Sequence, residues 1–141
     1  MNILLVEDNP ADMRLVREAM NECVTSATLH WVADGDAALD YLHRRGVHTE
    51  AVPPDLVLLD LNLPGVSGKE VLSEIKRDPQ LGSIPVVVLT SSAAREDVLD
   101  IYRAHGNAYM VKPTDFDAYV ALVERIQTYW LRAVLLPTRA A

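Results

Sequence analysis

Cysteine and long apolar runs are scarce in this sequence. The single cysteine, Cys23, excludes an internal disulfide and any zinc site built from several cysteines. No stretch approaches the roughly 18 consecutive apolar residues of a membrane-spanning helix. The N-terminus lacks the basic start, apolar run and cleavage site of a signal peptide. We therefore expect a cytoplasmic protein that does not associate with membranes.

Positive charge is also in short supply. The 141 residues include 13 Lys or Arg against 20 Asp or Glu, for a formal net charge of −7. No basic run is longer than Arg44-Arg45, which disfavours loose binding to nucleic acids. Half of the residues are hydrophobic, and the length is typical of one globular domain. We expect a single domain over residues 1–141, with a core over about 1–131 and a C-terminal extension over 132–141.

Short apolar segments alternate with segments of helical periodicity along the chain. The predicted strands cover residues 2–6, 28–32, 56–59, 85–89 and 108–111. The predicted helices cover residues 10–23, 35–44, 68–77, 95–105 and 116 to about 131. Strands that alternate with helices form parallel βαβ units, and continuously apolar strands are buried on both faces. The sequence therefore predicts an α/β fold with a doubly wound five-stranded parallel sheet and helices on both faces.

Polar residues follow four of the predicted strands. Glu7 and Asp8 follow the first strand, Asp60 the third, Thr90 the fourth and Lys112 the fifth. Each of them alone is compatible with an ordinary role, as a helix cap or a surface charge. Ligands of doubly wound sheets bind beyond the carboxyl ends of the strands, which meet at one edge. Together, the five residues therefore predict a functional site at that edge.

The residue types of this predicted site indicate phosphoryl chemistry. Clustered carboxylates repel one another unless a cation joins them, and Mg²⁺ prefers carboxylates together with waters and a phosphate oxygen. The ammonium of Lys112 and the hydroxyl of Thr90 suit a phosphoryl group in transfer. The nucleophile would be a carboxylate, which forms an aspartyl phosphate. No histidine or cysteine joins the group, and the chain has no glycine-rich phosphate loop.

In this order, the residues resemble the receiver domain of two-component response regulators. The resemblance extends over nearly the whole chain. It is carried by Glu7-Asp8, the run LLDLNLPG over residues 58–65 with Gly68, Thr90-Ser91 and Lys112-Pro113. It implies a flavodoxin-like receiver fold with strand order 2-1-3-4-5.

The resemblance also implies a role for each matching residue. Asp60 would be the phosphoacceptor. Mg²⁺ would be bound by the carboxylates of Asp8 and Asp60, by the backbone carbonyl of Asn62, and by Glu7 through water.

Further roles follow from the same resemblance. Thr90 and Lys112 would contact the phosphoryl oxygens. Thr90 and Tyr109 would form the conformational switch, and the bond before Pro113 would be cis. The side chains that tune dephosphorylation would be those of Asn62 and Ser92.

Three segments resemble a narrower group, the stand-alone receivers that are paired with phytochrome histidine kinases. These segments are residues 3–12, 58–92 and 129–137, and the long connection over 45–54 is similar too. The resemblance implies a single-domain response regulator, not an enzyme, that accepts a phosphoryl group from a phosphohistidine of a sensor kinase. A switch acting on a partner, a phosphorelay intermediate and a phosphate sink all remain open, as do the kinase and the target.

Two other functions fit parts of the pattern. A Mg²⁺-dependent aspartyl-phosphate phosphatase would carry a second acid two residues after the nucleophile, where this chain has Asn62. A pseudo-receiver used only for binding would have lost the aspartate, the lysine or the acidic pair. This chain retains all three, so both alternatives are disfavoured.

The last predicted helix is apolar around more of its circumference than one buried face requires. Its core side is predicted at Phe116, Val120, Val123, Ile126 or Gln127, and Trp130. Further apolar residues follow at Tyr119, Leu122, Leu131, Val134 and 135–137. Packing of the tail within the monomer is one interpretation. We favour a homodimer through this helix and tail, with Tyr119 and Tyr129 near its axis.

Overall fold

The computed structural model describes residues 1–23 and 27–137 and contains alternating strands and helices. The strands are β1 (Asn2–Val6), β2 (Thr28–Val32), β3 (Leu56–Leu59), β4 (Val86–Thr90) and β5 (Ala108–Val111). The helices are α1 (Pro10–Glu22), α2 (Gly35–His43), α3 (Gly68–Arg77), α4 (Arg95–Arg103) and α5 (Phe116–Ile126). A short 3₁₀ helix, η1 (Gly46–His48), lies in the long connection, and a π-helix, η2 (Gln127–Ala133), continues α5. The predicted boundaries agree with these to within two residues, except that the last predicted helix, 116 to about 131, is α5 to Ile126 followed by η2 to Ala133.

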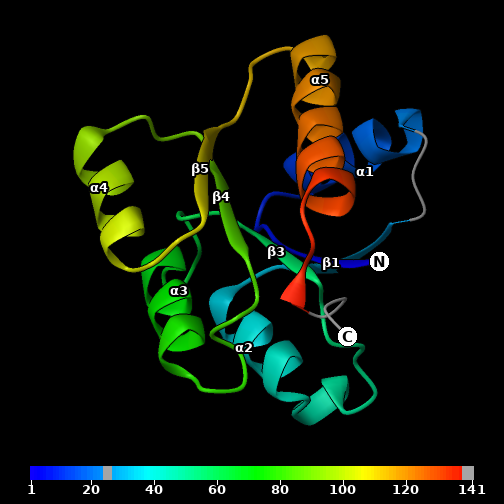
Figure 1. The fold of residues 1–141 in the computed structure, drawn as a ribbon. Coiled ribbons are helices and arrows are strands. Elements are labelled where there is room, and N and C mark those ends of the chain that lie inside the picture. The colour runs from blue at the N-terminus through cyan, green and yellow to red at the C-terminus, as the bar shows by residue number, and fades with distance from the viewer. Residues whose placement is uncertain (24–26, 138–141) are drawn as a thin grey trace.

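The five strands form one parallel sheet in the order β2-β1-β3-β4-β5 (Figure 1). The predicted fold class and strand order are therefore confirmed. The central strands β1, β3 and β4 are apolar on both faces, and all four residues of β3 are buried.

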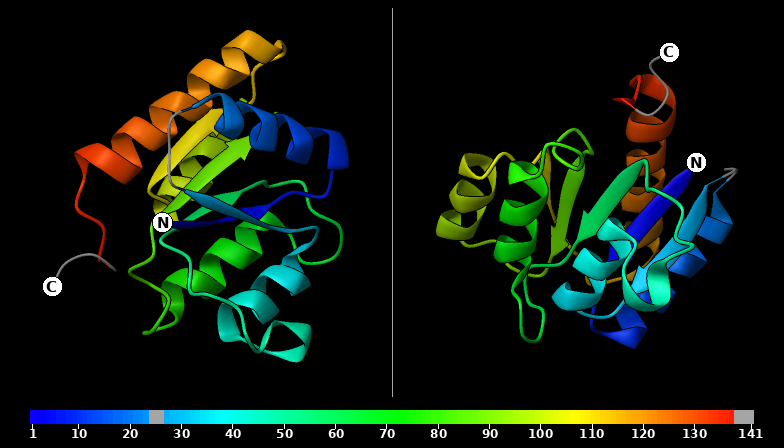
Figure 2. Two further views of the ribbon diagram at one scale, coloured as in Figure 1. Left: turned by 90° about the vertical axis from the view of Figure 1, so that its right-hand side faces the viewer. Right: turned by 90° about the horizontal axis from the view of Figure 1, so that it is seen from below.

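Helices cover both faces of the sheet, as Figure 2 shows from the side. α1 and α5 pack on one face over Ile3, Leu5 and Leu58, and α2, α3 and α4 cover the other face over Leu4, Val57 and other apolar side chains. No helix in the described ranges is long and apolar enough to cross a bilayer.

Four of the helices begin at a side-chain cap. In each case the oxygen of the capping side chain accepts a backbone N–H of the first turn, which satisfies a donor that the helix leaves unpaired. These capping residues are Asn9, Asp34, Ser67 and Asp115. Asn9 and Ser67 matter most for the site, since they begin the helices that follow β1 and β3.

The buried face of α5 differs from the predicted one. Phe116 was predicted in the core but is 38% exposed, whereas Tyr119 was predicted on the outer side but is 2% exposed. Phe116 is the first residue of α5, where the helix extends past the strand ends (Figure 1). The wider turn of η2 then brings Gln127 to the buried side next to Ile126, so both are buried. Because Tyr119 is enclosed by the monomer, it is not available for contact with a second copy, as the predicted dimer requires.

Candidate functional site

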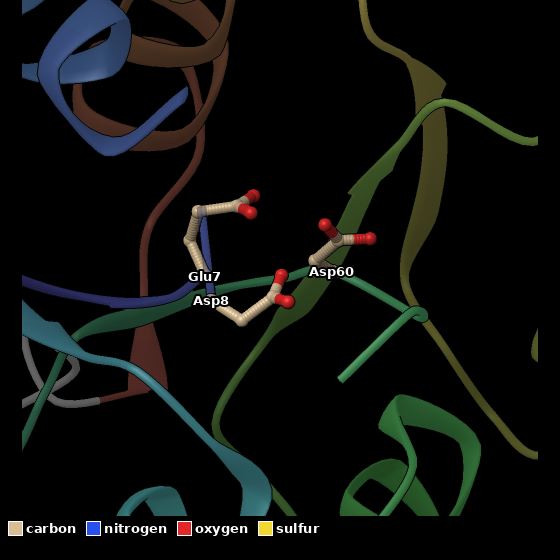
Figure 3. Close-up of side chains that lie close together, drawn as sticks. All are labelled: Glu7, Asp8 and Asp60. Carbon is tan, nitrogen blue, oxygen red and sulfur yellow. The ribbon is translucent and has the colours of Figure 1, made fainter. Parts of the chain in front are cut away.

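The ends of β1 and β3 bring three carboxylates together. Val6 pairs with Leu59 in the parallel register, so the residues that follow them leave the sheet side by side. Glu7, Asp8 and Asp60 each offer a carboxylate oxygen, and these oxygens lie within 4.8 Å of one another. In Figure 3 the three side chains converge on a common space. Glu7 and Asp60 are buried and Asp8 is exposed, so the group opens to solvent on one side.

The glycine that begins α3 makes room for Asp60. The N–H of Gly68 donates to the carbonyl of Leu61, which folds the start of α3 back under the end of β3. A Cβ atom at Gly68 would lie 2.6 Å from Cα of Leu61 and against the carbonyl oxygen of Asp60. A side chain there would displace the backbone that carries Asp60.

Lys112, which follows β5, lies among the carboxylates with its side chain 7% exposed. Its Nζ donates to Glu7 Oε2 at 2.7 Å, to Asp12 Oδ2 at 2.8 Å and to Asp60 Oδ2 at 2.9 Å. An ammonium has three N–H donors, so each of them is used. In the structure, Lys112 therefore compensates the buried carboxylates.

The pKa values at the site follow from burial and from Lys112. Burial raises the pKa of Glu7 to about 7, opposed by hydrogen bonds from Lys112 and from the N–H of Asn9. Burial acts on Asp60 in the same direction, but Lys112 and the N–H of Asn62, at 3.2 Å, outweigh it and lower the pKa of Asp60. Burial lowers the pKa of Lys112, but its three carboxylate partners outweigh it and raise the pKa. Of the two buried carboxylates that contact Lys112, Asp60 is therefore the more readily ionised.

Thr90 is the last residue of β4, and Tyr109 is the second residue of β5, three residues before Lys112. The hydroxyl of Thr90 is buried and near enough to Asp60 to contribute to its lowered pKa, but makes no hydrogen bond of ordinary geometry. The hydroxyl of Tyr109 donates to the backbone carbonyl of Ser92 at 2.8 Å. The Ser92 hydroxyl donates to Asp97 at 2.6 Å, so it is already engaged with α4.

The prediction of a cis bond before Pro113 is wrong, because no peptide bond in the described residues is cis. The trans isomer is the intrinsically preferred one by about 0.5–1 kcal/mol. The N–H of Lys112 donates to the carbonyl of Thr90 at 2.8 Å, which continues the pairing of β5 with β4 up to the residue before Pro113.

Two residues of this site were not predicted from the sequence. Asp12, in the first turn of α1, is the third carboxylate on Lys112. The indole N–H of Trp31 donates to the carbonyl of Glu7 at 2.7 Å, which ties the end of β2 to the acidic pair. The sequence does indicate Asp12 indirectly. It lies three residues after Asn9, the cap of α1, and the first turn of α1 lies beside the end of β1.

The fold and this edge of the sheet together define the class of two-component signalling receivers. The "Response regulator receiver domain" family matches residues 3–124. Response regulator Rcp1 of Synechocystis sp. is 44% identical over 135 residues, which cover 96% of this chain and 92% of Rcp1. The probable methanogenesis regulatory protein FilR2 of Methanothrix harundinacea is 47% identical over 131 residues, covering 92% of this chain and 83% of FilR2.

Solved structures of response regulators also resemble this chain over nearly its whole length. The phosphorylated cyanobacterial phytochrome response regulator RcpA superposes with a TM-score of 0.92 at 43% identity, over 96% of this chain and 97% of RcpA. The Mn²⁺-bound form of Rcp1 superposes with a TM-score of 0.90 at 43% identity, over 96% of this chain and 98% of that chain. The chain belongs to the response regulator receiver domain family. It is a two-component response regulator whose acidic group is suited to a divalent cation.

Proposed function

We propose that Asp60 accepts a phosphoryl group from a phosphohistidine of a sensor histidine kinase. The observation that carries this assignment is the setting of Asp60: its carboxylate is buried, lies next to two further carboxylates and accepts a hydrogen bond from Lys112. Asp8 is exposed and burial raises the pKa of Glu7, whereas Asp60 is buried and Lys112 lowers its pKa.

The transfer forms one bond and breaks one. A carboxylate oxygen of Asp60 attacks phosphorus, the P–N bond to the imidazole breaks, and the leaving nitrogen keeps the electron pair. Lys112 and Thr90 donate to the phosphoryl oxygens, and the unpartnered hydroxyl of Thr90 is available for this. The chain is a phosphoacceptor and not an enzyme, although its own residues assist both uptake and loss of the phosphoryl group.

Mg²⁺ is the cation proposed for the acidic group. Carboxylate oxygens are the hard ligands that it prefers, and the opening at Asp8 leaves room for its waters. Asp8 and Asp60 would hold it through their carboxylates, Asn62 through its backbone carbonyl, and Glu7 through water. When bound, Mg²⁺ supplies positive charge that offsets the carboxylates and the phosphoryl oxygens.

Phosphorylation changes the conformation of the protein through Thr90 and Tyr109. When Thr90 turns toward it, the β4–α4 connection shifts, and this connection contains the Ser92 carbonyl to which Tyr109 is bonded. Asn62 and Ser92 flank the water that hydrolyses the aspartyl phosphate and so set its lifetime. For Ser92 this role requires release from Asp97.

The upstream partner is a sensor kinase, and the similarity to Rcp1 and RcpA favours a phytochrome. The receiver domain acts in the cytoplasm, by contacts or by passing its phosphoryl group onward, without binding nucleic acid or a membrane. Phosphorylation of Asp60 is compatible with three roles, namely a switch acting on a partner, a phosphorelay intermediate and a phosphate sink.

Uptake of the phosphoryl group is tested by incubating the protein with acetyl phosphate and Mg²⁺ and measuring the intact mass. We expect one phosphoryl group per chain, and none when a chelator replaces Mg²⁺. A mass that does not change under any of these conditions would rule out the function proposed here.

Trp31 is expected to report Mg²⁺ binding by its fluorescence, because its indole is bonded to the backbone of Glu7. A Mg²⁺ titration should give a saturable change that Trp31→Phe abolishes and Asp8→Asn weakens. Trp130→Phe is the matched control, since Trp130 packs against the α1–α5 core, and it should keep the response. A change that disappears with Trp130 instead would place the reporter away from the acidic group.

Two copies of the chain pair through the last helix and tail. The apolar surface that supports this is smaller than the sequence predicts, because Leu136 is buried within the monomer. It retains Tyr129, 55% exposed, and Leu135, 76% exposed. A groove of about 540 Å³ at Tyr129 is lined by Ala121, Glu124, Arg125, Thr128, Tyr129 and Ala133.

Light scattering at tens of micromolar protein tests the pairing. We expect a dimer that Tyr129→Glu converts to a monomer, with Val47→Glu as the matched control on the distant connection, where Val47 is 92% exposed. Leu122→Glu is unsuitable, because Leu122 packs against the core and a charge there would also destabilise the monomer. A monomeric wild-type protein, with and without acetyl phosphate, would refute the dimer.

A further inference from the structure

Lys112 has no spare donor in the structure, and its three partners are not equivalent. Glu7 and Asp60 belong to the group of oxygens that could hold a cation, whereas Asp12 does not. Asp12 is carried by α1, its side chain is 27% exposed, and its Oδ2 lies 2.8 Å from Nζ of Lys112. Only one partner of Lys112 therefore lies outside the candidate metal site.

A divalent cation in the acidic group would weaken two of the three bonds. The cation would attract the carboxylates of Glu7 and Asp60, which would weaken their attraction to Lys112. It would also repel the ammonium of Lys112 directly. The charge of Asp12 would not be shared in this way. Without Asp12, the cation and Lys112 would compete for the same carboxylates, and the cation carries twice the charge.

The geometry points to Asp12 as a positioning residue that retains the Lys112 ammonium at the site once a divalent cation is bound. The inference rests on the function proposed above. On phosphorylation, the Lys112 donor that now reaches Asp60 Oδ2 turns to a phosphoryl oxygen, while Asp12 keeps a second donor fixed. Asp12 thus keeps the Lys112 ammonium in place as a hydrogen-bond donor beside a divalent cation that would otherwise displace it by repulsion.

Double-mutant cycles on the free energy of unfolding test this directly. One cycle combines Asp12→Asn with Lys112→Met, and the other combines Glu7→Gln with Lys112→Met, each in chelator and in saturating Mg²⁺. We expect the coupling between Glu7 and Lys112 to be mostly lost in Mg²⁺ and the coupling between Asp12 and Lys112 to be retained. A parallel loss of both couplings would overturn the role of Asp12.

Phosphorylation kinetics give a second, independent test. At saturating Mg²⁺, Asp12→Asn should lower the maximal rate with acetyl phosphate roughly tenfold, without raising the acetyl phosphate concentration at half-maximal rate. Asp12→Glu restores the charge and should recover most of the rate. Glu18→Gln, which removes an exposed charge from the same helix, should match the wild type.

The outcomes separate this inference from the proposed function. If the wild type takes up a phosphoryl group and Asp12→Asn equals it or exceeds it in maximal rate, Asp12 does not position Lys112. If the wild type takes up none, the proposed function fails, and the unfolding cycles still decide whether Asp12 retains Lys112 beside Mg²⁺.

Discussion

Asp60→Asn is expected to take up no phosphoryl group from acetyl phosphate in Mg²⁺. Asn keeps the size of the side chain and its contact with the N–H of Asn62, but an amide oxygen is not a nucleophile toward phosphorus. Intact mass spectrometry is the measurement. The expected loss is complete, because the two other carboxylates of the group, Asp8 and Glu7, are proposed to hold the cation and not to attack phosphorus.

Asp117→Asn serves as the matched control for this variant. Asp117 is an exposed residue in the first turn of α5, so its substitution removes the same charge away from the site. It should be phosphorylated like the wild type. An Asp60→Asn protein that still gains one phosphoryl mass would move the acceptor to another residue.

Lys112→Met is expected to destabilise the metal-free protein by about 3 kcal/mol, because it removes the ammonium from two buried carboxylates and a half-buried one. For a chain of this size, this corresponds to a fall in melting temperature of roughly 10 °C. Saturating Mg²⁺ should recover most of the loss, since it replaces the missing positive charge and binds only the folded protein. Thermal unfolding in chelator and in Mg²⁺ measures both effects.

Lys69→Met is the matched control, because Lys69 is also bonded to two carboxylates, those of Asp97 and Asp100. Lys69 is 43% exposed, so water screens its ion pairs and the expected loss is below about 1 kcal/mol, with no response to Mg²⁺. Equal losses in the two lysine variants, or a Lys112→Met protein that Mg²⁺ does not stabilise, would contradict the assignment of Lys112 as the counter-charge of the acidic group.

The placement of the site was predictable because it depends on the order of elements. Alternating strands and helices require parallel strands, and parallel strands bring their carboxyl ends to one edge. Glu7, Asp60 and Lys112 are far apart in the chain, but each directly follows a strand, and the structure places them in contact. Thr90 and Asp8 lie at the same edge for the same reason.

Other features depend on how the elements pack, and the sequence pattern did not resolve them. Asp12 is near Lys112 because of the angle at which α1 crosses the end of the sheet, and no periodicity encodes that angle. The face of α5 shifted as well: Tyr119 is buried and Phe116 is exposed, since both faces of this helix carry apolar residues.

The sequence by itself determined the parallel sheet, its strand boundaries and the acidic edge, because these follow from local periodicity and from residues at strand ends. Only the tertiary structure decided which partners Lys112 has, that the bond before Pro113 is trans, and how much of the C-terminal segment remains outside the core. The physical reason is that hydrogen bonds and burial at these positions depend on the distances between α1, α5 and the sheet. Those distances are set by side-chain packing across the whole domain.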